Sequence, residues 1–172
     1  LLINWNVQAA ITAESFDTPA KMGNLLIFAP EGTGCTYEGN VVINGMAEKI
    51  SLTHGKGFRS PQAFKAKDIT YKRNFSMKSG NKINAAGWEA IVLPFDVQSF
   101  SNEKQGELAP FNSGKKGAKP FWLAQMTTDG FEHTTAMKAN KPYIISLPNS
   151  ESYEDEFNIS GEVQFHAEDA GG

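Results

Sequence analysis

The chain is divided into many short apolar segments by residues that end regular structure, and this division constrains its fold more than any other feature. Sixteen glycines and eight prolines are spread along 172 residues. No apolar stretch between them keeps a helical period over the length of an ordinary helix. The pattern predicts about ten to twelve short strands and at most one or two short helical turns. We therefore expect an all-β fold, an antiparallel β-sandwich of the jelly-roll kind.

The most apolar run lies at residues 87–97 and reads Gly-Trp-Glu-Ala-Ile-Val-Leu-Pro-Phe-Asp-Val. Ile91, Val92 and Leu93 follow one another without a polar residue, which is typical of a strand that is buried on both faces. We predict that this run is the central strand of the core, with Trp88 as one of its structural residues.

The strand predicted before it, residues 68–75, alternates between apolar and polar positions. A period of two places Arg73 on the same face as the apolar Ile69, so its side chain should point inward. A buried guanidinium has to be paired or stacked. We therefore predict a structural role for Arg73, with a carboxylate partner on the next strand, either Asp96 or Glu89.

Glycine and proline are also spread through residues 99–119, which we interpret as one long irregular loop. A loop of about 20 residues without regular structure is unusual in a compact domain, so we expect this one to be functional or mobile. Residues 1–172 are expected to form a single domain, with 1–22 as a leading segment from a preceding region. Because the chain starts without Met, we expect it to be part of a longer protein.

Charge and hydropathy argue against two classes of partner. The formal charge of −3 comes from 16 basic and 19 acidic residues that are mixed along the chain, and no basic run is longer than the pair Lys115 and Lys116. A nucleic-acid partner is therefore not expected. No segment reaches the roughly 18 uninterrupted apolar residues that indicate a transmembrane helix, so no membrane span is expected either.

The usual sequence arrangements for catalysis and metal binding are missing. There is no Gly-x-Ser-x-Gly motif. The single Cys35 has no histidine beside it in the sequence, although the fold could still bring a histidine next to Cys35. His54, His133 and His166 do not share the short spacing of a zinc motif. We expect no metal, no other cofactor and no enzymatic activity.

An acidic segment near the C-terminus leaves one alternative open. Glu151, Glu154, Asp155 and Glu156 could bind calcium weakly, but they lack the alternating Asp/Asn and Gly order of a dedicated calcium loop. A solvated turn is the better interpretation of these carboxylates.

The aromatic residues are the best candidates for ligand binding, because flat rings can stack on sugar rings if they stand exposed on a sheet face. The competing interpretation is that rings within strongly apolar strands belong to the core. Trp122 stands next to the predicted loop and is the best exception. We name Trp122, Phe121 and Tyr153 as candidate ligand-binding residues.

Two strands form an unusual pair: residues 64–75, which contain Tyr-x-Arg, and residues 87–97, which contain Trp followed by Leu-Pro-Phe. With the later segments 120–123 and 138–145, they resemble a C-terminal β-rich domain of large secreted and surface proteins of gut and oral anaerobic bacteria. Such domains, of the Bacteroidetes type, often follow leucine-rich repeats and have no assigned role. The resemblance covers about residues 23–167 and offers no catalytic residues to carry over.

The resemblance implies an extracellular or cell-surface location, with neighbouring domains of a larger chain as partners. Together with the aromatic residues, it leads us to expect a non-catalytic accessory domain that mediates adhesion by binding a glycan or a protein. The alternative is a structural domain that spaces or caps a multi-domain surface protein.

Overall fold

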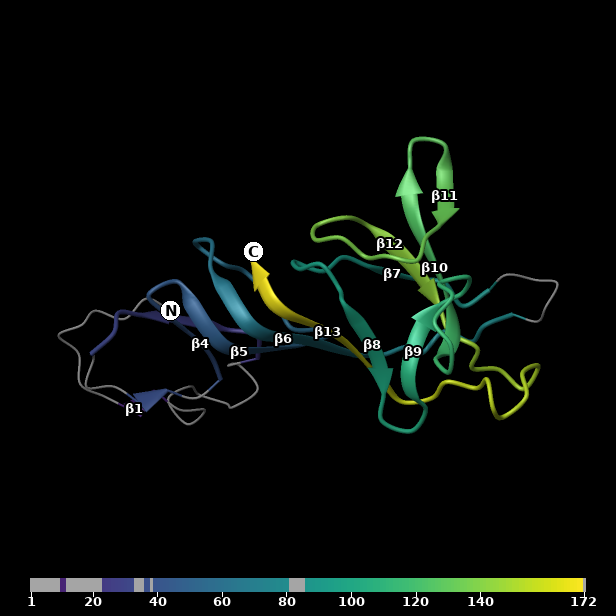
Figure 1. Ribbon diagram of the computed structural model, residues 1–172, viewed down its shortest axis with the longest axis horizontal. Coiled ribbons are helices and arrows are strands. Elements are labelled where there is room, and N and C mark those ends of the chain that lie inside the picture. Colours follow the sequence, from purple (N-terminus) through teal and green to yellow (C-terminus); the bar gives the residue numbers. More distant parts are fainter. Residues whose placement is uncertain (1–9, 12–22, 33–35, 38, 81–85, 172) are drawn as a thin grey trace. The chain divides into compact units, whose positions relative to one another are not determined.

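The computed structural model describes residues 10–11, 23–32, 36–37, 39–80 and 86–171. In this part of the chain all regular structure is β, with thirteen strands and no helix (Figure 1). Eleven of these strands form one hydrogen-bonded sheet, and two form a small separate sheet. The expectation of an all-β fold is therefore confirmed.

The chain divides into two compact units, and two long strands contain the points of division. The first unit holds residues 1–72 and 167–172, and the second holds residues 73–166. The boundaries fall within β6 (Lys65–Asn74) and β13 (Glu162–Gly171). The expectation of a single domain stays a prediction.

In the first unit, hydrogen bonding follows the order β2, β4, β5, β6. The bounds are β2 (Leu26–Ala29), β4 (Asn40–Ile43) and β5 (Met46–Thr53). β2 runs parallel to β4, and β5 runs parallel to β6. β4 turns back into β5 through Asn44 and Gly45, whose φ angles of 50° and 78° match the tight hairpin turn that Asn-Gly favours. The separate sheet pairs β1 (Ala10–Ile11) with β3 (Thr36–Tyr37) in parallel.

In the second unit, the order is β13, β8, β9, β10, β12, β7, with β11 also paired to β10. The bounds are β7 (Glu89–Ile91), β8 (Ser99–Asn102), β9 (Gly106–Pro110), β10 (Lys119–Thr127), β11 (Gly130–His133) and β12 (Tyr143–Ser146). These pairs are antiparallel except for β9 with β10, which is parallel. The sheet is therefore mixed, with parallel as well as antiparallel pairs, and the finer prediction of an antiparallel β-sandwich is not confirmed. An apolar strand can pair with its neighbour in either direction, and the path of the connection between the two strands decides whether the pair is parallel or antiparallel.

Phenylalanine rings make up much of the core of the second unit. Phe100 lies 5.0 Å from Phe121 and 5.6 Å from Phe165 between ring centroids, both in edge-to-face geometry. The side chains of Phe95, Phe121 and Phe165 are at most 1% exposed. Edge-to-face packing adds to the stabilisation that these rings supply by burial.

The apolar run at residues 87–97 is not a central strand. Only Glu89–Ile91 forms a strand, β7, and it lies at the end of the hydrogen-bonded order. Val92 is 58% exposed, whereas Leu93 and Phe95 are buried after the strand has ended. Since Pro94 has no N–H to continue a sheet, the chain leaves the sheet here and its apolar side chains turn alternately toward the core and the solvent.

The segment 99–119 is not one long loop either. It contains the hairpin of β8 and β9, which leaves only 111–118 as irregular structure before β10. Asn102 organises the hairpin turn: its Oδ1 accepts the N–H groups of Lys104 and Gln105, and its Nδ2 donates to the carbonyls of Ser160 and Glu162. The sequence of this short hairpin is largely polar and has no apolar run, so its two strands could not be recognised from the sequence.

Arg73 is buried, with 8% of the side chain exposed, and it binds Glu89, as the sequence predicted. Its Nη2 lies 2.5 Å from Glu89 Oε2, and its Nη1 donates to the carbonyl of Ala90 at 2.7 Å. The other carboxylate oxygen of Glu89 accepts the N–H groups of Ser76 and Met77. Asp96, the other predicted partner, instead binds Lys138 at 2.8 Å on the surface.

The Glu89 carboxylate makes stability depend on acidity. Burial raises its pKa, but the hydrogen bonds from Met77, Arg73 and Ser76 outweigh that effect and hold the pKa below its ordinary value of 4.5. The stabilisation is therefore fully present above that value and is lost as the pH falls through the lowered pKa. We expect the urea midpoint of the wild type to fall more steeply below pH 4.5 than that of Glu89→Gln.

The comparison with Glu89→Gln is needed because Asp96 also has a lowered pKa, owing to its hydrogen bond with Lys138. The wild type and Glu89→Gln both keep Asp96, so only Glu89 can make their urea midpoints depend differently on pH. Parallel profiles for the two proteins would contradict the prediction.

Candidate functional site

An open cleft of about 520 Å³ lies beside Trp122 in the second unit. It is lined by Phe111, Asn112, Trp122, His133, Thr134 and Thr135. We call it the Trp122 cleft. Phe111 is 55% exposed and Trp122 is half-buried, so the lining combines accessible aromatic surface with amide and hydroxyl groups.

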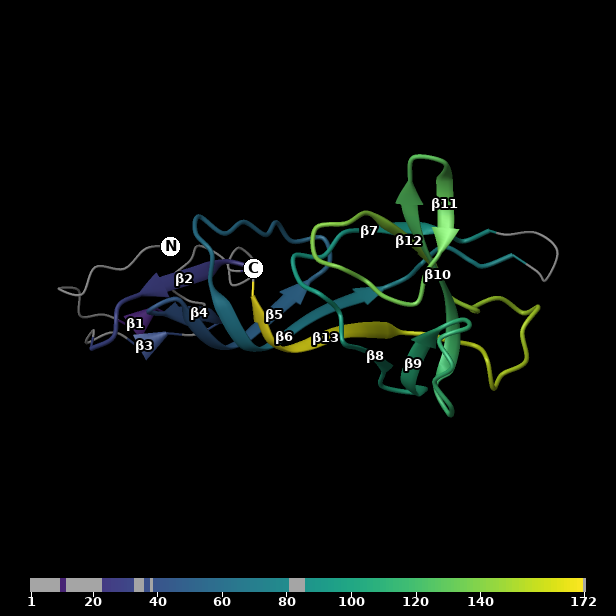
Figure 2. The same cartoon turned by 45° about the horizontal axis from the view of Figure 1, so that its top comes forward.

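The cleft forms where two strands meet along one edge of β10. β9 runs parallel to β10 and ends opposite Phe121, whereas β11 runs antiparallel and ends opposite Ala124. Figures 1 and 2 show β9 and β11 beside opposite ends of β10. Their carboxyl ends therefore point toward each other, and Trp122 stands between them.

Backbone hydrogen bonds hold both walls of the cleft. The Phe111 N–H donates to the carbonyl of Phe121 at 2.7 Å, and the Thr134 N–H donates to that of Leu123 at 3.1 Å. These two carbonyls are two residues apart and so lie on the same edge of β10. Asn112 has a φ of 66°, a left-handed conformation that asparagine tolerates and that turns the chain away after Phe111. The lining residues are therefore fixed by regular structure on both sides.

The alternation of β10 decides which predicted aromatic residues reach the surface. Phe121 and Leu123 are 1% exposed and face the core, so Trp122 between them faces outward. Phe121 is therefore a core residue, and its prediction as a ligand-binding residue is wrong. Tyr153 lies against Trp122, with 5.7 Å between ring centroids. Trp88 is half-buried and lies 6.4 Å from the ring of His133.

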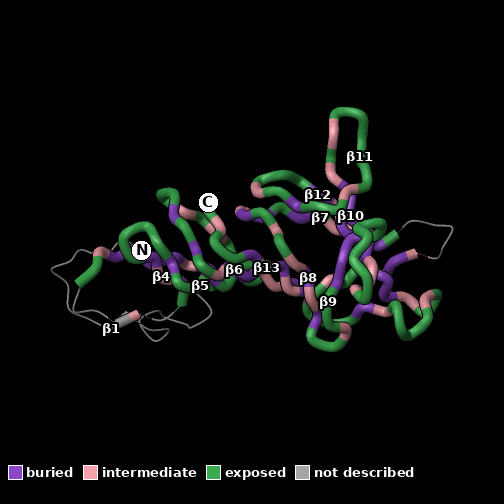
Figure 3. The backbone as a smooth tube through the Cα atoms, in the orientation of Figure 1, coloured by how far each residue is buried: buried purple, intermediate pink, exposed green. Residues whose placement is uncertain are grey.

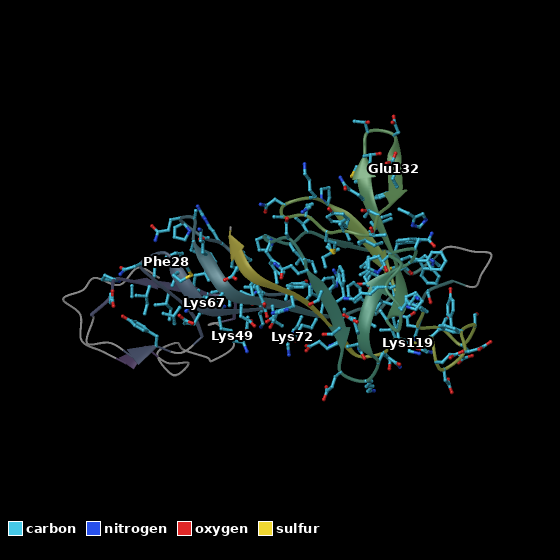
Figure 4. The ribbon with its side chains drawn as sticks, viewed as in Figure 1. Phe28, Lys49, Lys67, Lys72, Lys119 and Glu132 are labelled. Atoms are coloured by element: carbon cyan, nitrogen blue, oxygen red, sulfur yellow. The ribbon has the colours of Figure 1, made fainter. Side chains whose placement is uncertain are left out.

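The lining favours recognition of an uncharged ligand. Among the described residues that line the cleft, none is Asp, Glu, Lys or Arg. Two nearby charged residues are engaged or directed elsewhere: Lys119 Nζ lies 5.9 Å from the ring centroid of Phe157, and Glu132 alternates with His133 along β11 and so should face the other way. Figure 4 labels both residues. Aromatic faces supply stacking, and the Asn and Thr groups supply donors and acceptors.

Sequence analysis identified Trp122 but missed most of its neighbours in the cleft. Those neighbours are Phe111, Asn112, His133, Thr134 and Thr135. Phe111 and His133 are about 20 residues apart along the chain and become neighbours only because both follow strands that pair with β10. The one sequence pattern that points to the site is Phe-Asn-Ser-Gly at 111–114, a turn that begins with an aromatic residue.

A second, larger hollow of about 800 Å³ is lined almost entirely by polar side chains of the segment after β12. Asn149 anchors it, since its Oδ1 and Nδ2 bind the N–H of Ser79 and the carbonyl of Met77. Glu151 and Asp155 are the acidic residues that line it, together with Lys78. The described part of the chain contains no group of three or more His, Cys, Asp or Glu side chains that could hold a metal ion.

The remaining candidate residues lie apart from the cleft or outside the described residues. The His54 ring binds the Tyr71 hydroxyl at 2.8 Å, and His166 lies 3.4 Å from the Ser99 hydroxyl. Cys35 is outside the described residues, and so is most of the leading segment 1–22. The described residues contain no helix that is long enough and apolar enough to cross a membrane.

Comparisons of the chain with protein-family models, with curated proteins and with solved structures found no match.

Proposed function

We propose that this chain is a non-catalytic accessory domain of a secreted or cell-surface bacterial protein, and that it binds a glycan through the Trp122 cleft. The observation that supports the proposal is the cleft itself, in which an outward-facing tryptophan and an exposed phenylalanine lie beside uncharged hydrogen-bonding side chains. The resemblance to surface-protein domains agrees with this role and extends the proposal to a jelly-roll-like sandwich.

A glycan fits the chemistry of the cleft better than a charged small molecule does. The C–H face of a sugar ring is apolar and packs on an aromatic face, while its hydroxyls need neutral donors and acceptors at the rim. Asn112, Thr134 and Thr135 supply such groups around Trp122 and Phe111. A carboxylate or phosphate would meet no Lys or Arg among the described lining residues.

Trp122→Ala is expected to weaken glycan binding by about 2 kcal/mol, roughly 30-fold, because it removes the largest stacking surface in the cleft. A glycan array with wild type and variant identifies the ligands, and calorimetry on the best of them measures the loss. The truncated side chain is on the outer face of the sheet, so the variant should remain folded.

Phe131→Ala is the matched control. Phe131 is also an exposed aromatic on the β10–β11 hairpin, at 56%, but it does not line the cleft. Figure 3 shows the outer part of this hairpin exposed. Equal losses in the two variants would contradict the assignment to Trp122. No binding by either variant or by the wild type would favour the structural spacer instead.

A further inference from the structure

We infer that the site takes an internal stretch of an uncharged, linear oligosaccharide rather than a single sugar or an acidic glycan, and that the saccharide continues from the Trp122 cleft past His133 to Trp88. This inference rests on the proposed function and deepens it. It is carried by the strand register, two aromatic contacts and the distribution of charge in the second unit.

The register places Trp88 and Trp122 on the same face. Trp122 pairs with Ser146 and Ala124 with Ile144, so these four residues share one face of β10 and β12, on which the small Ala124 and Ser146 are 3% and 2% exposed. Ile144 in turn pairs with Ala90 of β7. Trp88 is two residues before Ala90 and so faces the same way.

The spacing across this face exceeds one ring. β12 lies between β7 and β10 in the sheet. Neighbouring strands are about 4.8 Å apart, so the backbones at Trp88 and Trp122 are about 10 Å apart across the sheet. Two tryptophans whose backbones are about that far apart suit successive units of a saccharide better than one isolated sugar ring.

His133 links the two aromatic positions. It lines the Trp122 cleft and also lies 6.4 Å from the Trp88 ring, at an interplanar angle of 50°. By register His133 pairs with Ala124, which lies on the same face of the sheet as Trp122; Ala124 is 3% exposed, whereas His133 is exposed. The cleft and Trp88 are therefore parts of one surface rather than two separate sites.

Two acidic residues next to this surface are not presented to it. Glu89 follows Trp88 directly, but its carboxylate is held by Arg73 and by two backbone N–H groups. Glu132 faces away from His133 by the alternation of β11. A uronic or sialic acid would lose hydration at its carboxylate and would meet no Lys or Arg among the described residues that line the cleft.

The test measures the affinity of the whole chain for neutral gluco-, xylo- and manno-oligosaccharide series, from one sugar to about six, with oligogalacturonate and a sialylated oligosaccharide as acidic comparators. In at least one neutral series we expect affinity to rise about tenfold or more between the shortest and longest members, as a second stacking surface is engaged. The acidic ligands should bind more weakly than neutral ligands of equal length.

Trp88→Ala should abolish the gain with length while leaving the affinity for the shortest bound ligand within about twofold. His133→Ala removes a residue that lines the cleft and also lies against Trp88, so it should lower the affinity for the longest ligands more than that for the shortest. Because His133 is exposed, this second variant keeps the test valid if Trp88→Ala is unstable. Phe157→Ala, which removes an aromatic that is 39% exposed and outside the cleft lining, should change neither value. Equal affinity for all lengths, or preference for the acidic ligands, would overturn this inference alone. Binding of no saccharide at all would overturn the proposed function as well.

Discussion

Glu89→Ala is expected to destabilise the folded chain by about 3–5 kcal/mol, because it leaves the buried Arg73 guanidinium without its ionic partner. The Nε of Arg73 already has no hydrogen-bond partner among the described residues. The variant also deprives the N–H groups of Ser76 and Met77 of their acceptor. Urea unfolding monitored by tryptophan fluorescence measures the change.

The exposed ion pair between Lys67 and Glu48 supplies the matched control. Its side chains are 56% and 79% exposed, although the 2.6 Å separation is similar to that of the buried pair. Glu48→Ala should cost less than about 1 kcal/mol, since solvent screens the charges and the lysine stays hydrated. Comparable losses in the two variants would show that burial does not decide the contribution of the Arg73–Glu89 pair.

Gly87→Ala is expected to destabilise by more than about 2 kcal/mol. Gly87 has a φ of +73°, which costs an L-residue about 1–2 kcal/mol, and a Cβ there would lie 2.6 Å from backbone atoms of Lys78 and Ser79. The neighbouring backbone would have to shift, at about 1–3 kcal/mol. That shift would disturb the hydrogen bond from the Ser79 N–H to Asn149, so thermal unfolding should occur at a clearly lower temperature.

Gly114→Ala separates the two contributions. Gly114 has a φ of +74°, almost the same as that of Gly87, but a Cβ there would meet nothing within 4 Å. It should therefore show only the conformational loss of about 1–2 kcal/mol. If both variants lose the same stability, the close approach to Lys78 and Ser79 is not the cause.

The parts of the fold that could be predicted are those governed by alternation within one strand. The inward position of Arg73 and its pairing with Glu89 follow from a period of two and from the energetics of a buried charge. The same rule could have excluded Phe121 as a ligand-binding residue, because two adjacent strand residues cannot both face one ligand. Trp122 and Phe121 therefore could not share the site.

The run at 91–93 shows where this kind of inference fails. Three consecutive apolar residues match a central strand buried on both faces, and they match equally well an edge strand that ends and turns its next residues alternately inward and outward. Only the position of β7 at the end of the sheet order, with Val92 exposed, distinguishes the two. Likewise, the polar hairpin in 99–119 is stabilised by Asn102 and distant carbonyls rather than by its own apolar pattern.

By itself, the sequence determined the all-β class and the buried Arg73 with its carboxylate, because each depends on turn residues and on neighbours within one strand. Tertiary structure alone decided the mixed strand directions and the Trp122 cleft. Pairing direction depends on how connections cross between strands, and the cleft exists because β9 and β11, distant in sequence, end against the same edge of β10. Local residue patterns carry no information about which distant strand ends will meet.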